Sequence, residues 1–170
     1  LLESVLVVAI MLVVGGVFML FVDKWFSRTT VSQDIGWKRA LRIGFWQCIA
    51  MVPGVSRSMA TIVGGMSTRL TRKNAAEFSF FLAVPTMAAA GGYKLVKLLL
   101  DPAGQAMIQE NLTTLLIGNV IAFIVAMGAI KFFIGFLTRH GFKAFGYYRI
   151  VVGGILLALI FSGVDLSDML

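Results

Sequence analysis

The sequence predicts an all-α integral membrane protein, made of transmembrane helices and one re-entrant helix hairpin. Of the 170 residues, 59% are hydrophobic and only 14% are charged, and the mean hydropathy is +0.92. Soluble domains carry about 25% charged residues. Apolar runs of membrane-spanning length recur along the chain, and one pair of shorter apolar runs is separated by a Pro-Gly break.

The pair of short runs predicts the hairpin. Residues 41–52 are apolar, but a helix of about twelve residues is only about 18 Å long, whereas the hydrocarbon core is about 30 Å thick. Pro53 and Gly54 break this run, and the apolar run 59–66 that follows is shorter still. Two half-length helices around such a turn are typical of a segment that enters and leaves the membrane on one side.

The remaining apolar runs are long enough to cross the membrane. They are residues 1–22, 75–100, 113–137 and 147–161. Pro85 predicts a kink in the second of them. Residues 101–112 and 138–146 are predicted loops. Because the chain begins at Leu1, inside an apolar run, we interpret residues 1–170 as a single membrane domain forming the C-terminal part of a longer protein.

The basic residues predict an orientation. If residues 41–66 are re-entrant, the connections 23–42, 69–73 and 138–149 share one face and hold eleven basic residues. These are Lys24, Arg28, Lys38, Arg39, Arg42, Arg69, Arg72, Lys73, Arg139, Lys143 and Arg149. The other face receives Glu3, Asp101, Glu110, Asp165 and Asp168, with Lys94 and Lys97 at a helix end. The positive-inside rule then predicts cytoplasmic basic loops and a periplasmic C-terminus. Since the positive charges lie in short loops, the net charge of +7 does not indicate a nucleic-acid partner.

The hairpin turn carries the residues of an anion site. A helix that restarts near Ser56 has N–H groups without intrahelical partners and the positive end of its dipole at that point. Arg57 adds a planar five-donor guanidinium suited to phosphate oxygens. Ser58 and Thr61 lie three residues apart on one helical face, and Gly54 allows the tight turn. An arginine at membrane depth is costly, which favours a functional role, and we expect a phosphate or diphosphate guest.

Each of these residues also has a structural interpretation. Arg57 could pair with a buried acid, and Ser56 could be a helix N-cap and nothing more. Ser58 and Thr61 could satisfy backbone carbonyls within their own helix. Gln47, the lone polar residue of the first arm, could be an interhelical hydrogen bonder or a substrate contact.

Four other positions are interpreted as structural, with a catalytic role for Glu77 as the alternative. Cys48 is expected to pack in an apolar environment. Asn74 and Glu77 fit a capping box at the start of a helix. His140, the only histidine, is expected in a solvated loop.

The hairpin motif resembles the second signature of the undecaprenyl-diphosphate phosphatases, the bacitracin-resistance protein family. The residues that carry the likeness are Gln47-x-x-Ala50-x-x-Pro53-Gly54-x-Ser56-Arg57-Ser58-x-x-Thr61, then Ala75-Ala76-Glu77-Phe78-Ser79-Phe80-Phe81-Leu82-Ala83-Val84-Pro85, and Tyr148-Arg149-Ile150. The resemblance implies a bacterial inner-membrane enzyme that hydrolyses undecaprenyl diphosphate to the monophosphate carrier lipid of peptidoglycan synthesis. It also implies an inverted repeat with two re-entrant hairpins, of which this chain holds one.

The resemblance assigns roles to this chain's residues. Arg57 and Ser56 are expected to be catalytic, with Gly54, Ser58, Thr61 and Gln47 joining them in substrate binding. The family's glutamate-rich first signature, with its histidine, is absent here. The acid–base groups and the ligands of a divalent cation, Mg²⁺ or Ca²⁺, are therefore expected in a missing N-terminal part, and this fragment alone is expected to be inactive.

Other functions stay open at this point. The expected partners are a polyprenyl diphosphate and membrane lipids, a homodimer is left open, and no nucleic acid is expected. Broken helices meeting at the membrane midplane also describe transporters. A lipid-phosphate flippase is therefore the main alternative, and an anion-binding membrane scaffold without catalysis is a third.

Overall fold

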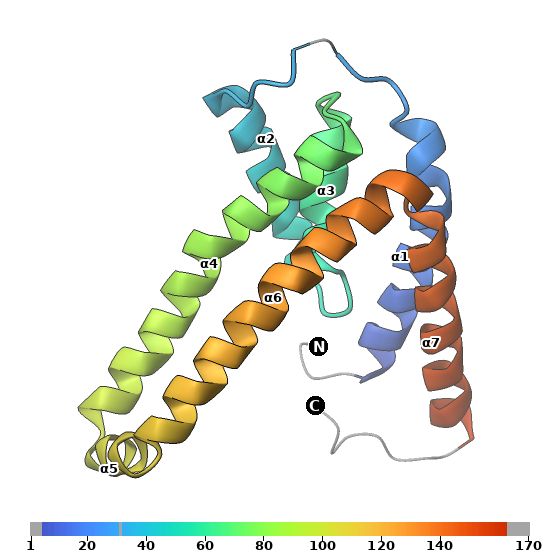
Figure 1. The fold of residues 1–170 in the computed structure, drawn as a ribbon. Helices are drawn as coiled ribbons and strands as arrows, with labels where there is room; N and C mark the ends of the chain where they lie inside the picture. Colours follow the sequence, from blue (N-terminus) through green and yellow to red (C-terminus); the bar gives the residue numbers. More distant parts are fainter. Residues whose placement is uncertain (1–4, 31, 163–170) are drawn as a thin grey trace. The chain divides into compact units, whose positions relative to one another are not determined.

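The computed structural model describes residues 5–30 and 32–162, and within these ranges the chain is helical and has no β-strand (Figure 1). The elements are α1 Val5–Trp25, α2 Trp37–Cys48, the 3-10 helix η1 Ile49–Met51, α3 Arg57–Ser67, α4 Arg72–Leu100, α5 Pro102–Glu110, α6 Leu112–His140 and α7 Lys143–Phe161. Four of them, α1, α4, α6 and α7, are long and apolar enough to cross a membrane. The predicted all-α integral membrane class is confirmed.

The chain divides into two compact units. The first unit comprises Leu1–Ser79 and Phe136–Leu170, and the second comprises Phe80–Gly135. Helices α4 and α6 each pass from one unit into the other. The hairpin motif lies entirely in the first unit. The first four residues of the predicted span 1–22 lie outside the described residues.

Helices α1 and α7 pack closely through small residues, side by side in Figure 1. A β-carbon on Gly16 would lie 2.8 Å from the Gly146 carbonyl oxygen, and one on Gly153 would lie 3.0 Å from the Ala9 carbonyl oxygen. Backbones at this separation leave no room for larger side chains. Because lipid tails are as apolar as the helices, close van der Waals packing of this kind is what holds membrane helices together.

Helices α2 and α3 form a helix hairpin. Ile43 of α2 is fully buried, and Gly64 of α3 lies against Trp46, since a β-carbon there would be 2.7 Å from the Trp46 β-carbon. Gly65 lies as close to Ala75 of α4. These glycines therefore allow the helices to approach closely. The hairpin begins earlier than predicted, at Trp37, and its entry into a membrane from one side stays a prediction.

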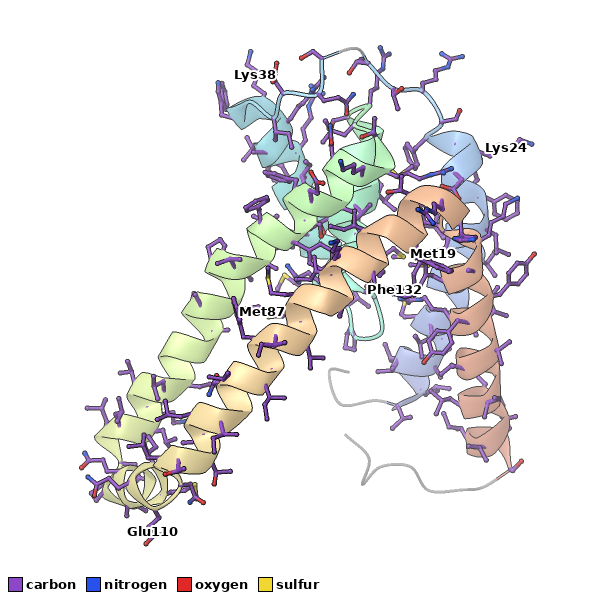
Figure 2. The ribbon with its side chains drawn as sticks, viewed as in Figure 1. Met19, Lys24, Lys38, Met87, Glu110 and Phe132 are labelled. Atoms are coloured by element: carbon purple, nitrogen blue, oxygen red, sulfur yellow. The ribbon has the colours of Figure 1, made fainter. Side chains whose placement is uncertain are left out.

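Hydrogen bonds and an ion pair link three connections at one end of the first unit: the one between α1 and α2, the one between α3 and α4, and the one between α6 and α7. Asp23, at the end of α1, lies 2.8 Å from Arg72 Nε at the start of α4 and accepts a hydrogen bond of 2.8 Å from the Phe142 N–H before α7. The side-chain oxygen of Gln33 accepts the Thr71 N–H at 2.8 Å. The ends of α1 and α2 that carry Lys24 and Lys38 are labelled in Figure 2. The two arms of the hairpin therefore start and finish at the same end of the unit.

The second unit contains a helix that the sequence did not predict. Residues 102–110 form α5, and the expected loop 101–112 is wrong. The Asp101 carboxylate accepts the Ala103 N–H at 3.3 Å, and Pro102 occupies the first turn. An aspartate cap followed by proline is a recognised helix start. Elsewhere in this unit, Pro85 lies inside α4, which continues on both sides of it.

Several element ends also differ from the predictions. Helix α6 continues to His140, which stacks on Phe136 with 4.5 Å between ring centroids, so His140 is an exposed helix-end residue rather than a loop residue. Helix α4 is capped by Thr71, whose hydroxyl oxygen accepts the Asn74 N–H at 3.2 Å, and not by Asn74. Cys48 is exposed in the described chain, contrary to the expected packing.

Candidate functional site

The hairpin turn is a tight bend that depends on glycine. Helix α2 is followed by η1, and the Val55 N–H donates to the Val52 carbonyl at 3.1 Å across Pro53 and Gly54. Gly54 has a φ of +85°, in the left-handed region that a side chain disfavours. Proline followed by glycine in these two central positions is the arrangement of a type II turn. A β-carbon on Gly54 would also lie 2.6 Å from the Val8 carbonyl oxygen of α1.

Helix α3 begins directly after this turn, with Ser56 as its N-cap. The Ser56 hydroxyl oxygen accepts the Met59 N–H at 3.3 Å. Among the residues that the structure describes, the N–H groups of Ser56, Arg57 and Ser58 have no hydrogen-bond acceptor. These donors point out of the start of a helix whose dipole is positive at this end. The predicted helix restart is confirmed, and the cap role of Ser56 leaves its own proton free to donate.

Arg57 is the first residue of α3, and one of its nitrogens is buried without a partner. Its Nη1 finds no hydrogen-bond acceptor within the described part of the chain. No described carboxylate lies within 4.0 Å of it to form an ion pair. The structural alternative, an ion pair with a buried acid, therefore finds no counterpart in residues 5–30 and 32–162. A buried guanidinium nitrogen without an acceptor is suited to bind an anionic oxygen.

Gln47 and Thr61 differ in what they offer at this turn. The side-chain oxygen of Gln47, on the last turn of α2, is buried and has no described donor. Thr61 is 0% exposed, and its hydroxyl contacts the Arg57 carbonyl at 3.0 Å and the Ser79 hydroxyl at 2.5 Å. Its hydroxyl is therefore used in packing α3 on α4, and the expected direct contact of Thr61 with substrate is not supported. Ser58 stays half-buried beside Arg57.

Arg149 does not lie in a basic loop, where the charge pattern predicts it. It lies inside α7 and is only 7% exposed. Its Nη2 donates to the Gly54 carbonyl at 2.6 Å and to the Met11 carbonyl at 3.1 Å. Taking it from the eleven basic positions leaves ten. A guanidinium within an apolar run was the signal that could have marked it as buried and engaged.

The described residues do not form a metal centre. No group of three histidine, cysteine, aspartate or glutamate side chains lies close enough to hold an ion within residues 5–30 and 32–162. Two of the acids have other partners: Asp23 pairs with Arg72, and Glu77 lies 3.9 Å from Lys73. The donors at the start of α3, which are backbone amides, hydroxyls and the Arg57 guanidinium, form a candidate anion cradle, and a bound cation does not fit these residues alone.

Comparison with known proteins gives one consistent result. The family described as bacitracin resistance protein BacA matches residues 1–155. An undecaprenyl-diphosphatase of Porphyromonas gingivalis is 59% identical over 98% of this chain and 59% of its own length. An undecaprenyl-diphosphatase of Bdellovibrio bacteriovorus is 52% identical over 98% of this chain and 63% of its own length. The chain thus spans about three fifths of the length of the curated relatives it matches.

Proposed function

Because the chain belongs to the bacitracin resistance protein BacA family, we propose that it forms part of an undecaprenyl-diphosphatase and supplies the diphosphate-binding side of the active site. The relatives above carry that activity in their names. The observation that carries the proposal is the start of α3, where the buried Arg57 Nη1 and the N–H groups of Ser56, Arg57 and Ser58 have no acceptor among the described residues. A diphosphate offers oxygens to both kinds of donor.

The proposed reaction transfers the terminal phosphoryl group of undecaprenyl diphosphate to water. The bond between the terminal phosphorus and the bridging oxygen breaks, a new bond forms to the water oxygen, and undecaprenyl phosphate and inorganic phosphate leave. Negative charge grows on the bridging oxygen as this happens. The Arg57 fork holds two phosphate oxygens at once, and the α3 amides donate where the charge develops. Ser56, capping α3, donates its free proton to the same phosphate.

A divalent cation belongs to the proposal as an expectation only. The described residues do not provide a binding site for such an ion, so the proposed reaction does not include one. The attacking water also needs a base to accept its proton. From the family resemblance, we expect that base outside this chain. Dependence on Mg²⁺ or Ca²⁺ is a prediction for a protein of full family length.

The proposed location is the bacterial inner membrane. We place the ends joined by Asp23 and Gln33 in the cytoplasm and the C-terminus in the periplasm, in accordance with the positive-inside rule. The ten basic residues left after Arg149 is removed support this orientation. Membrane lipids are the proposed surroundings, and a homodimer stays an open prediction.

The experiment uses the chain within a protein of full family length, reconstituted in liposomes with undecaprenyl diphosphate. Release of inorganic phosphate above a heat-inactivated sample is the expected result. Movement of the lipid between leaflets without phosphate release would support the flippase alternative instead. Binding of the lipid with neither outcome would support the non-catalytic scaffold.

A further inference from the structure

Arg149 is a cationic side chain that reaches from one transmembrane helix to the hairpin turn, 95 residues away in the chain. Its Nη2 donates both of its protons to backbone carbonyls, to Gly54 at 2.6 Å and to Met11 of α1 at 3.1 Å. With 7% exposure it is the only buried charged side chain among the described residues. The contact joins α7, α1 and the turn, all within the first unit.

Two glycines make room for this contact. A β-carbon on Gly15 of α1 would lie 2.7 Å from Arg149 Nη2 and 3.3 Å from its Cζ. The turn is seated on the same helix, since Gly54 lies against the backbone of Val8. The guanidinium therefore passes beside α1 at a glycine and meets the turn where the turn rests on α1.

Packing alone does not explain an arginine at this position. No described carboxylate lies within 4.0 Å of it, and its Nε is buried without an acceptor. A buried guanidinium without a counter-ion is costly in a membrane protein, and an apolar side chain of similar length would fill the same space between helices. The guanidinium instead donates to two carbonyls, and only the Met11 carbonyl belongs to a transmembrane helix.

The contact with the Gly54 carbonyl orients the start of the anion cradle. The peptide group between Gly54 and Val55 is held at both ends, because Arg149 binds its oxygen and the Val52 carbonyl accepts its N–H at 3.1 Å. Ser56 follows this peptide group immediately and caps α3. The orientation of this peptide group therefore determines the positions of the free N–H groups and of the Arg57 side chain at the start of α3.

We propose that Arg149 is a positioning residue for the anion-binding turn: it locks the Gly54 carbonyl so that the donors at the start of α3 are arranged before the phosphate arrives. The effect on turnover rests on the proposed function, whereas the effect on the turn does not. Preorganised donors contribute to rate because no reorganisation is needed during the reaction.

The experiment compares four variants of a protein of full family length that contains this chain: Arg149→Met, Arg149→Lys, Lys143→Met and Gly153→Ala. Phosphate release from farnesyl diphosphate gives kcat and KM for the folded fraction, and hydrogen–deuterium exchange reports on the amides of residues 52–60. Lys143 is an exposed cation of the same helix and is the control for charge. Gly153→Ala disturbs α1–α7 packing at Val13, Ala9 and Leu12, the three residues nearest its β-carbon, without replacing Arg149 or a residue of the turn, and is the control for stability.

For Arg149→Met we expect a loss of tenfold to a hundredfold in kcat/KM, the scale of a 1 Å misplacement, together with faster exchange at residues 52–60. Arg149→Lys, a single-point donor, should recover part of both. Lys143→Met should stay within threefold of wild type. Gly153→Ala should melt at a lower temperature but keep wild-type exchange at residues 52–60 and its kcat per folded molecule.

If Arg149→Met loses activity without faster exchange at residues 52–60, or shows faster exchange without losing activity, the positioning role is overturned. Wild-type behaviour in both measurements would also overturn it. If Arg149→Met does not fold, Arg149→Lys decides, because full activity with wild-type exchange there would also overturn it. If the wild-type protein releases no phosphate, the proposed function has failed. The exchange of residues 52–60 then decides the role of Arg149 by itself.

Discussion

Replacing Arg57 by alanine removes the one guanidinium at the start of α3. Its Nη1 is buried and has no described acceptor, so the substitution breaks no hydrogen bond from that atom within the described chain. In the substrate complex it removes a preorganised donor to developing charge. The cost of such a loss is about 2.7–4 kcal/mol, or roughly a hundredfold to a thousandfold in kcat. Because the guanidinium also binds the ground-state diphosphate, we expect KM to rise as well.

The structure also predicts that Arg57→Ala retains some activity. The N–H groups of Ser56, Arg57 and Ser58 belong to the backbone, and Arg57→Ala leaves them in place. We therefore expect low but measurable turnover, and only a small recovery in Arg57→Lys, because an ammonium is a point charge and does not grip two oxygens. Phosphate release by the purified protein of full family length is the assay, with membrane expression and thermal unfolding measured beside it.

The alternative interpretation of Arg57 makes the opposite forecast. If Arg57 served to neutralise a buried acid, Arg57→Ala would leave that acid unpaired, and the protein would fail to accumulate in the membrane. No such acid lies within 4.0 Å among the described residues, so we expect normal expression. A well-folded Arg57→Ala protein within threefold of wild-type activity, a change of about 0.65 kcal/mol, would refute the reasoning.

Three further predictions concern topology, packing and metal. Single cysteines at Lys38 and Lys73, in a Cys48→Ser background, should react with an impermeant reagent from the same side of the membrane, and opposite accessibility would contradict the re-entrant hairpin. Gly16→Ala should lower stability by about 1–3 kcal/mol, because its β-carbon would lie 2.8 Å from the Gly146 carbonyl oxygen, whereas Gly154→Ala meets nothing within 4 Å and should unfold at the wild-type temperature. Chelation of divalent cations should abolish phosphate release by the full-length protein and added Mg²⁺ or Ca²⁺ should restore it; full activity in chelator would remove the metal from the proposal.

The hairpin could be predicted from sequence because its signals are local. Arm length, the Pro-Gly break and the serine before the second arm lie within one short stretch, and the structure has a turn at Gly54 and a cap at Ser56. Helix α5 had local signals as well, in Asp101 and Pro102. A short polar stretch between two spans is nevertheless typical of a loop, and this pattern outweighs the two local signals in a prediction from sequence.

Contacts between distant parts of the chain could not be predicted. Arg149 meets partners 95 and 138 residues earlier, and nothing in its own neighbourhood reveals that its carbonyl acceptors lie on α1 and the turn. Its position near basic residues placed it in a loop, because the charge pattern does not distinguish a loop arginine from one buried in the next helix. Thr61 was likewise assigned to the substrate, whereas the packing of α3 on α4 gives its hydroxyl a partner in Ser79.

The most direct test of the central claim asks whether the diphosphate occupies the turn between η1 and α3. A cysteine at Val55, in a Cys48→Ser background of full family length, is labelled with a maleimide in the presence of farnesyl diphosphate or farnesol. A second cysteine at Lys38, at the other end of the hairpin, is the control. The account predicts that farnesyl diphosphate slows labelling at residue 55 and not at residue 38, while farnesol slows neither. Unchanged labelling at residue 55 at concentrations of farnesyl diphosphate that saturate turnover would contradict it.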